Sequence, residues 1–310
     1  MIEVSGLSKS YNSIRAVDDV SFVVGKGEII GFLGPNGAGK TTTMRIITGA
    51  IPSDTGSVKV AGFDVFESPM EVKKRIGYLP ENPPVYSEMT VSGYLAFVSA
   101  LKGIGGREQK AGVDRAMERC NITTVAKRLI GNLSKGYKQR VGIAQAILGN
   151  PEVLILDEPT IGLDPNQIHE VRGLIRELAN DKTVVLSTHI LPEVEMTCQR
   201  VIVINRGKIV ATDSIDNIIS GRNGSLDVYV RISGDRDEAM KTLRAALKVN
   251  PTAADEEGAF IVPFGMANDR REELASSLVG GGFGLIEMRA LGRSLEDVFR
   301  KLTTDESTKN

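Results

Sequence analysis

A glycine-rich run near the N-terminus has the residue types and spacing of a phosphate-binding loop. It reads Gly34-Pro35-Asn36-Gly37-Ala38-Gly39-Lys40-Thr41-Thr42, and from Gly34 to Thr41 it fits the pattern G-x-x-x-x-G-K-[ST]. Glycines let the backbone wrap closely enough for successive N–H groups to face phosphate oxygens. The pattern predicts that Lys40 reaches the β- and γ-phosphates of a nucleotide and that the Thr41 hydroxyl binds Mg²⁺. Chance produces it in roughly one chain in a hundred of this length.

The flanking segments place this run between a strand and a helix. A buried strand is predicted over Gly27 to Leu33. A helix is predicted from about Gly39, with Met44, Ile46 and Ile47 on its buried side. The N-terminal end of such a helix carries partial positive charge, which adds to the attraction for phosphate. Because the motif requires a strand before it and a helix after it, this context favours phosphate binding.

A pair of carboxylates, Asp157 and Glu158, is the second candidate for chemistry. It follows the apolar run Val153 to Leu156. A parallel strand delivers the residues at its carboxyl end to the edge of the sheet where ligands bind. There Asp157 can hold Mg²⁺, and Glu158 can orient or deprotonate an attacking water. Such a pair is by itself more often a polar turn, but the upstream phosphate loop favours the catalytic interpretation.

Three more segments match motifs of a known family and occur in the same order along the chain as in that family. Leu133 to Arg140 reads Leu-Ser-Lys-Gly-Tyr-Lys-Gln-Arg and resembles the signature Leu-Ser-Gly-Gly-Gln. Ile161 to Asp164 comes shortly after Glu158, and His189 ends the run Leu-Ser-Thr-His. With the phosphate loop and the carboxylate pair, these segments make residues 1 to about 220 resemble the nucleotide-binding subunit of the ABC transporter family.

The resemblance implies a role for each matching residue. Ser134 and Gly136 would cap the γ-phosphate of an ATP that the opposite subunit holds, so that two subunits enclose each nucleotide. Asp164 lies in the loop that joins the two subunits and is counted with the nucleotide-binding residues. His189 matches the switch histidine at the γ-phosphate. Tyr11 lies where the family stacks an aromatic ring on adenine, although an aromatic residue in an N-terminal strand is often only part of a core.

For the whole chain the resemblance implies an ATPase with ATP and Mg²⁺ as cofactors. Lys40, Glu158 and His189 would act at the reacting phosphate. Binding of ATP would close the interface between the two subunits, and hydrolysis would open it again. A partner protein could use this motion. The implied partners are an integral-membrane permease and a second ATPase subunit, either a copy of this chain or a related one. We expect a cytoplasmic protein, peripheral on the inner face of the cell membrane through the permease.

Two segments differ from the commonest pattern of the family. Glu81, in the run Ile76 to Glu81, replaces a loop glutamine, and Lys135 and Tyr137 replace a glycine and a glutamine of the signature. These differences, and the ending Ser294 to Thr303, resemble the branch that pairs with separately encoded exporter permeases for drugs, polysaccharides or gliding motility. Export is therefore the expected direction of transport.

The role of Glu81 has two interpretations. A carboxylate oxygen is a good ligand for a hard cation, so Glu81 is expected to bind Mg²⁺ where the family uses an amide carbonyl. The alternative is that Glu81 faces solvent beside Pro80 and Pro83. Two other polar features, His169 and the run Lys73 to Arg75, are expected on the solvated surface.

Two other functions fit the sequence less well than transport. Soluble ATPases of this family that act on ribosomes usually carry two cassettes, and those that act on DNA insert a long coiled coil; this sequence has one cassette and no heptad insertion. A regulatory binder without catalysis would be expected to lack Lys40, Glu158 or His189, and all three are present. The cargo is set by the permease, so the ATPase sequence does not name it.

The composition argues against a nucleic-acid partner, a disulfide framework and a membrane span. The 310 residues have a formal net charge of −1, no Trp and 5% aromatic residues, which argues against a nucleic-acid partner. Cys120 and Cys198 are too few and too far apart for a disulfide framework or a metal site, and we expect structural thiols. We expect no signal peptide, and no apolar run approaches the roughly 20 residues that span a bilayer.

The predicted elements give an α/β fold, namely a P-loop ABC ATPase domain followed by a small C-terminal α/β domain. The ATPase domain, residues 1–220, is expected to combine a parallel sheet core, an antiparallel β region and a helical subdomain. Antiparallel strands are predicted in residues 1–30, and mostly helical structure over 83–146 with a break at 103–106. Buried strands at 153–156 and 184–186 flank a helix over 165–180.

A linker at 221–225 separates the second domain, whose predicted bounds are 225–303. Strands are predicted at 226–232, 260–263 and 285–289. Helices are predicted at 237–247, 269–278 and 294–302, and a flexible polar tail at 304–310.

Overall fold

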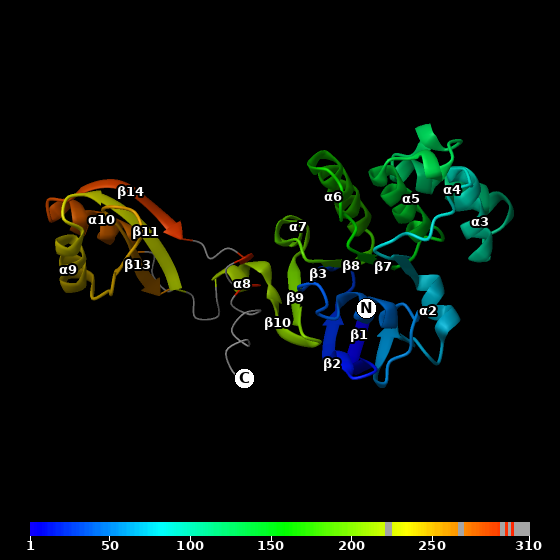
Figure 1. Cartoon of the computed structure of the whole chain (residues 1–310), viewed down its shortest axis with the longest axis horizontal. Coiled ribbons are helices and arrows are strands. Elements are labelled where there is room, and N and C mark those ends of the chain that lie inside the picture. Colours follow the sequence, from blue (N-terminus) through cyan, green and yellow to red (C-terminus); the bar gives the residue numbers. More distant parts are fainter. Residues whose placement is uncertain (221–224, 266–269, 292–294, 297–298, 301–310) are drawn as a thin grey trace. The chain divides into compact units, whose positions relative to one another are not determined.

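The computed structural model describes residues 1–220, 225–265, 270–291, 295–296 and 299–300 (Figure 1). Contacts divide the chain into two units, Met1–Asp213 and Ser214–Asn310. Helix α8 (Ile215–Ser220), which the predicted ATPase domain includes, therefore falls in the second unit. Most of the predicted linker, most of the predicted helix at 294–302 and the whole tail at 304–310 lie outside the described residues.

The first sheet of the N-terminal unit is antiparallel, with the strand order β2-β1-β4-β5. Its strands are β1 (Ile2–Tyr11), β2 (Ile14–Val24), β4 (Thr55–Val60) and β5 (Phe63–Asp64). Ile2 and Val4 of β1 are buried and alternate with exposed residues, which is the pattern of a sheet with one face on the core. The antiparallel region predicted in residues 1–30 is confirmed, and β4 and β5 extend it.

The second sheet has six strands in the order β10-β9-β3-β8-β7-β6. They are β3 (Ile29–Leu33), β6 (Ile76–Leu79), β7 (Val153–Asp157), β8 (Thr183–Thr188), β9 (Arg200–Asn205) and β10 (Lys208–Ser214). β3 pairs in parallel with β8 and β9, and β7 pairs in parallel with β6 and β8. The carboxyl ends of β3, β8 and β7 therefore meet at one edge, as the buried strands predict. β6, β9 and β10 are not among the predicted strands.

Helices lie on both sides of this parallel sheet. They are α1 (Lys40–Ile47), α2 (Pro69–Arg75), α3 (Val91–Leu101), α4 (Gly106–Arg119), α5 (Lys135–Ile147), α6 (Pro165–Ala179) and α7 (Leu191–Thr197). Leu154 and Leu156 of β7 pack in one core cluster with residues of α3 to α6, whereas Val153 and Ile155 pack in another with residues of α1 and the antiparallel sheet. This alternation confirms the predicted parallel sheet covered on both faces.

Helices α3, α4 and α5 form the predicted helical subdomain, and the predicted break falls between α3 and α4. Residues 83–90 and 120–134 hold turns and short 3-10 helices instead of α-helix. The reason is that α3 and α5 each begin at a new capping residue. The Thr90 side chain accepts a hydrogen bond from the Gly93 N–H, and the Ser134 side chain accepts one from the Tyr137 N–H.

The second unit contains an antiparallel sheet with the order β12-β13-β11-β14. Its strands are β11 (Ser225–Ser233), β12 (Thr252–Ala253), β13 (Ala259–Gly265) and β14 (Gly284–Leu291), and its helices include α9 (Arg236–Leu247) and α10 (Arg271–Gly280). Val230 and Phe260 of the sheet share one core with Leu243 of α9 and Leu274 of α10. The three strands and the first two helices predicted here are confirmed, and β12 and α8 are additional.

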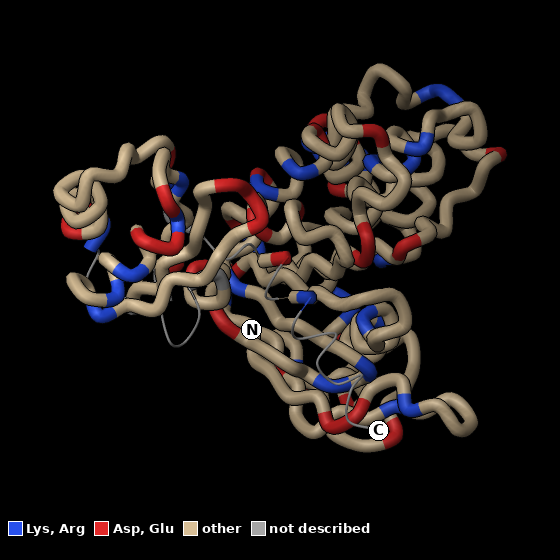
Figure 2. Tube along the Cα trace, turned by 60° about the vertical axis from the view of Figure 1, so that its left-hand side comes forward, with Lys and Arg blue, Asp and Glu red and all other residues tan. Residues whose placement is uncertain are grey.

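The structure shows the state of the cysteines, the distribution of the charged residues and the character of the helices. Cys120 and Cys198 are free, and burial raises the pKa of each thiol to about 12, as expected of structural cysteines. Lys, Arg, Asp and Glu are interspersed along the trace of each unit (Figure 2). Among the helices that the structure describes, none combines the length and apolar character that a membrane span requires.

Candidate active site

The phosphate loop connects β3 to α1, and its first and last glycines are required by space. A Cβ on Gly34 would lie 2.4 Å from the carbonyl oxygen of Ile204, and one on Gly39 would lie 2.3 Å from that of Ala16. Gly39 also has a φ of +109°, which residues with a side chain rarely adopt. Neighbouring backbone therefore excludes any side chain at both positions, and the loop can keep the tight path that phosphate binding needs.

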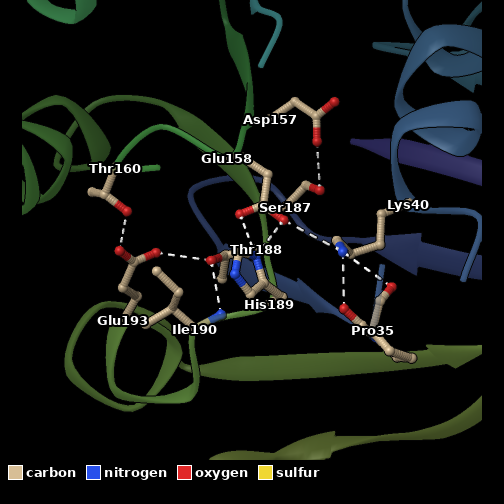
Figure 3. A network of polar contacts seen from close by, with 11 residues as sticks. Pro35, Lys40, Asp157, Glu158, Thr160, Ser187, Thr188, His189, Ile190 and Glu193 are labelled. Atoms are coloured by element: carbon tan, nitrogen blue, oxygen red, sulfur yellow. Dashed lines mark hydrogen bonds and ion pairs between the residues drawn. The ribbon is translucent and has the colours of Figure 1, made fainter. Parts of the chain in front are cut away.

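Lys40 begins α1, and its side chain lies against the loop. The side chain is only 6% exposed, and its Nζ donates to the carbonyl oxygens of Gly34 at 2.8 Å and Pro35 at 3.3 Å. The same Nζ lies 3.4 Å from Oε1 of Glu158. These contacts satisfy a buried ammonium, and they join two segments that lie far apart in sequence (Figure 3).

Glu158 follows β7 directly and is held in an uncommon conformation. Its φ of +51° lies in the left-handed region, which costs a non-glycine residue of order 1 kcal/mol and is frequent at functional sites. Its N–H donates to the carbonyl oxygen of Ser187 at 2.8 Å, which ties this turn to β8. Its two carboxylate oxygens lie 3.0 Å and 2.9 Å from Nδ1 of His189. The predicted catalytic residues Lys40, Glu158 and His189 are thus brought together.

Asp157 ends β7 and is completely buried. Its Oδ1 accepts a hydrogen bond from the Ser187 hydroxyl at 2.7 Å, and its Oδ2 has no hydrogen-bond partner among the residues that the structure describes. Burial raises the pKa of Asp157, although the Ser187 and Thr41 hydroxyls near its carboxylate oppose the rise. A buried carboxylate oxygen with no partner, beside the Thr41 hydroxyl, suits a hard cation such as Mg²⁺.

A pocket of about 300 Å³ opens at this edge of the sheet. It is lined by the phosphate loop, by the segment after β7 and by the loop after β6, through Asn36, Gly37, Gly39, Lys40, Thr41, Thr42, Glu81, Glu158 and Ile161. Glu81 is exposed to solvent, yet it shares this pocket with Lys40 and Thr41. The position of Glu81 is therefore compatible with both interpretations, a ligand of a metal ion in the pocket and a residue that faces solvent.

The signature residues lie elsewhere. Ser134 and Gly136 line a different cavity, of about 650 Å³, between α5 and α6. Ser134 caps α5, and a Cβ on Gly136 would lie 2.6 Å from Oε1 of Gln167. Asp164 caps α6 by accepting from the Gln167 N–H at 3.0 Å. Neither Ser134, Gly136 nor Asp164 lines the pocket at the phosphate loop of the same chain.

Tyr11, His169 and two lysines named from the sequence lie at the surface. Tyr11 is 45% exposed, so the alternative that Tyr11 is a core residue is wrong. His169 is exposed, as predicted. In the run Lys73 to Arg75 the two lysines are exposed, but the Arg75 guanidinium lies 4.2 Å from the ring centroid of Phe63 and is only partly solvated.

Sequence reasoning missed several polar residues of this region. Ser187, which binds both Asp157 and Glu158, could have been noticed as a hydroxyl residue at the end of the apolar run of β8. Thr160, Thr188 and Glu193 form a further hydrogen-bonded group that no local motif indicates.

A phosphate loop after β3 and a buried carboxylate pair after β7, on a parallel sheet, define a P-loop nucleotide-binding fold. The sequence profile of the ABC transporter family matches residues 17–161. The bacitracin transport ATP-binding protein BcrA of Bacillus licheniformis is 34% identical over 304 residues, 97% of each chain. The daunorubicin resistance ATP-binding protein DrrA2 of Streptomyces coeruleorubidus is 32% identical over 97% of this chain and 94% of its own.

A solved structure, that of an ATP-binding subunit of an ABC transporter, superimposes with a TM-score of 0.64 and 31% identity. It covers 70% of this chain and 91% of its own. The chain belongs to the ATP-binding subunits of ABC transporters, and it is an ATPase of that family.

Proposed function

We propose that this chain powers export through a separate membrane permease, with Lys40, Glu158 and His189 as its catalytic residues. The observation that carries the proposal is the contact of Glu158 with both Lys40 Nζ and His189 Nδ1. In this arrangement the Lys40 ammonium would bind the β- and γ-phosphates, and Glu158 would orient or deprotonate the attacking water. His189, held at the same carboxylate, would contact the γ-phosphate.

The proposal includes a metal ion and the remaining nucleotide contacts. Mg²⁺ would be held by the Thr41 hydroxyl and Asp157, with Glu81 as a further oxygen ligand, and it would neutralise charge on the phosphates. The backbone of Gly34 to Thr42 would surround the phosphates. Tyr11, which is exposed and therefore accessible, would stack on the adenine ring.

The proposed assembly is a dimer of ATPase subunits on a permease. Ser134 and Gly136 line a cavity distinct from the pocket at the phosphate loop. Their contribution to an ATP would come from the other subunit, together with the loop that ends at Asp164. A role in transport is supported by the names of similar proteins, which are transport and resistance ATP-binding proteins. The proposed location at the inner face of the cell membrane follows from the proposed contact with a permease.

The deciding experiment combines hydrolysis with binding. Glu158→Gln should reduce phosphate release by about 10²- to 10⁴-fold, the range expected for loss of a general base. Binding of a fluorescent ATP analogue should remain, because Glu158 acts on water. Lys40→Ala is the contrasting control and should weaken binding itself, because it removes a charged contact to phosphate. Wild-type phosphate release in Glu158→Gln would overturn the assignment.

The transport proposal is tested separately. Purification of the tagged chain from gently solubilised membranes of its own host should recover an integral-membrane protein together with it. Recovery with ribosomes or DNA, and with no membrane protein, would favour a different function.

A further inference from the structure

A buried carboxylate lies beside the candidate site without belonging to any motif. Glu193, on α7, is 1% exposed. Its Oε1 accepts a hydrogen bond from the Thr160 hydroxyl, and its Oε2 accepts one from the Thr188 hydroxyl at 2.9 Å. Figure 3 shows Glu193 between these two threonines. The two oxygens of one buried side chain are therefore hydrogen-bonded to two different segments, the loop after β7 and the end of β8.

Each of these two segments lies next to one of the proposed catalytic residues. Thr160 follows Glu158 by two positions, in the segment after β7, and Thr188 ends β8 immediately before His189. The Thr188 hydroxyl also accepts a hydrogen bond from the Ile190 N–H at 3.1 Å, so it fixes the backbone on both sides of His189. Glu193 thus bridges the two segments from which Glu158 and His189 approach each other.

The physical chemistry of this bridge favours a role in alignment. Removing a carboxylate from water is expensive unless its oxygens are hydrogen-bonded, and apolar residues of similar volume often serve a core at least as well. Hydrogen bonds to an ionised acceptor are shorter and roughly twice as strong as neutral ones. They are also directional, so two of them fix the positions of the donor threonines more closely than apolar packing does.

We propose that Glu193 is a positioning residue for hydrolysis: through Thr160 and Thr188 it holds Glu158 and His189 at the separation that the reaction requires. The proposal rests on the catalytic roles proposed above for Glu158 and His189. Glu193 lines no part of the pocket at the phosphate loop. Its loss should therefore affect the chemical step and leave ATP binding intact.

The first test separates kcat from KM. Glu193→Ala should lower kcat by about 10- to 100-fold, the loss expected when reacting groups are misplaced by about 1 Å. KM for ATP and the binding of a fluorescent ATP analogue should stay within about twofold of wild type. Glu193→Gln keeps the shape and one acceptor oxygen, so it should restore part of the lost kcat.

The threonines provide a milder test that does not remove a buried group of this size. Thr160→Val deletes the donor and should lower kcat, whereas Thr160→Ser keeps the hydroxyl and should retain it. Thr183→Val is the matched control. Thr183 is equally buried and lies at the opposite end of β8, where its hydroxyl accepts from the Gly27 N–H at 2.9 Å. A general packing defect would lower kcat in Thr183→Val as much as in Thr160→Val.

The outcomes separate this inference from the function on which it rests. A fall in kcat for Glu193→Ala and Thr160→Val, with Thr183→Val unchanged, supports the bridge. Wild-type kcat in folded Thr160→Val, or an equal loss in Thr183→Val, overturns it. If Glu158→Gln hydrolyses ATP at the wild-type rate, the proposed catalytic roles fail whatever the Glu193 variants do.

Discussion

The Lys135 side chain lies across the backbone of Gly162, so that a Cβ on Gly162 would be 2.2 Å from Lys135 Nζ. Lys135 stands in the signature at the start of α5, and Gly162 lies in the loop that leads from Glu158 to α6. The contact therefore joins two of the segments that resemble the family motifs, within one chain. Gly162 also has a φ of +67°, so both its conformation and its surroundings favour glycine.

The first prediction distinguishes these two reasons. Gly162→Ala should lower the free energy of unfolding by about 1 kcal/mol, because alanine is strained at positive φ. Lys135→Ala should restore little of that loss, because the end of a lysine side chain can swing away from an added methyl group. The measurement is urea unfolding followed by circular dichroism for both single variants and the double variant. A double variant as stable as wild type would show that the steric contact, not the backbone, requires glycine.

The second prediction concerns the sharing of a site between subunits. Ser134→Arg should block ATP hydrolysis while leaving the ATP affinity of the monomer nearly unchanged, because Ser134 would serve the nucleotide of the neighbour. Ser134 also caps α5, so Ser134→Ala is needed as a control for a loss of about 1 kcal/mol of stability. Equilibrium binding and phosphate release are the readouts. Collapse of monomer binding in Ser134→Arg, but not in Ser134→Ala, would contradict the arrangement.

The third prediction is a gain of stability at the cost of activity. Burial raises the pKa of Asp157 above its usual 3.8, so the ionised carboxylate destabilises the fold in the absence of a cation. Asp157→Asn should raise the free energy of unfolding at pH 7, without Mg²⁺, by about 1 kcal/mol, and it should lower Mg²⁺-dependent hydrolysis. Protonated Asp157 stabilises the folded state relative to the unfolded state. This stabilisation is complete below pH 3.8, and it is lost as the pH rises through the raised pKa of the folded state.

The free energy of unfolding, measured from below pH 3.8 to pH 7 for wild type and Asp157→Asn, tests whether the charge of Asp157 causes the difference in stability. The difference between Asp157→Asn and wild type should vanish at the acidic end and grow towards neutral pH. A difference of constant size would mean that the charge of Asp157 is not its source.

The fourth prediction tests the loop after β6. Glu81→Gln should keep an oxygen ligand and most of the activity, whereas Glu81→Ala should lower the apparent affinity for Mg²⁺ by severalfold. Titration of Mg²⁺ against the ATPase rate compares the two variants. Superimposable curves for Glu81→Ala and wild type would leave the solvent-facing interpretation of Glu81.

The fifth prediction concerns the second unit, whose sheet and helices have a core of their own. We propose that this accessory domain contributes nothing to the ATP site. A chain ended near Gly221 should therefore bind a fluorescent ATP analogue with an affinity within about twofold of the full chain. A soluble, folded truncation that has lost nucleotide binding would place the boundary wrongly. Circular dichroism supplies the folding control.

The sequence by itself determined those parts of this protein whose chemistry is contiguous along the chain. The phosphate loop is one such part, because its glycines, Lys40 and Thr41 act from a single turn between a strand and a helix. The apolar runs of β3, β7 and β8 likewise predict a buried parallel sheet. β6 was missed because its four residues, Ile76–Leu79, are too short a run for periodicity to distinguish.

Only the tertiary structure decided which distant residues meet. β3 and β7 both pair with β8, although long stretches of chain separate them, and this order brings Glu158 within 3.4 Å of Lys40 Nζ and 2.9 Å of His189 Nδ1. Glu193 had no signal at all, since a single glutamate in a short helix is ordinary in sequence. Its position as a bridge follows from burial between the loop after β7 and the end of β8, and burial is a property of packing that residue spacing does not encode.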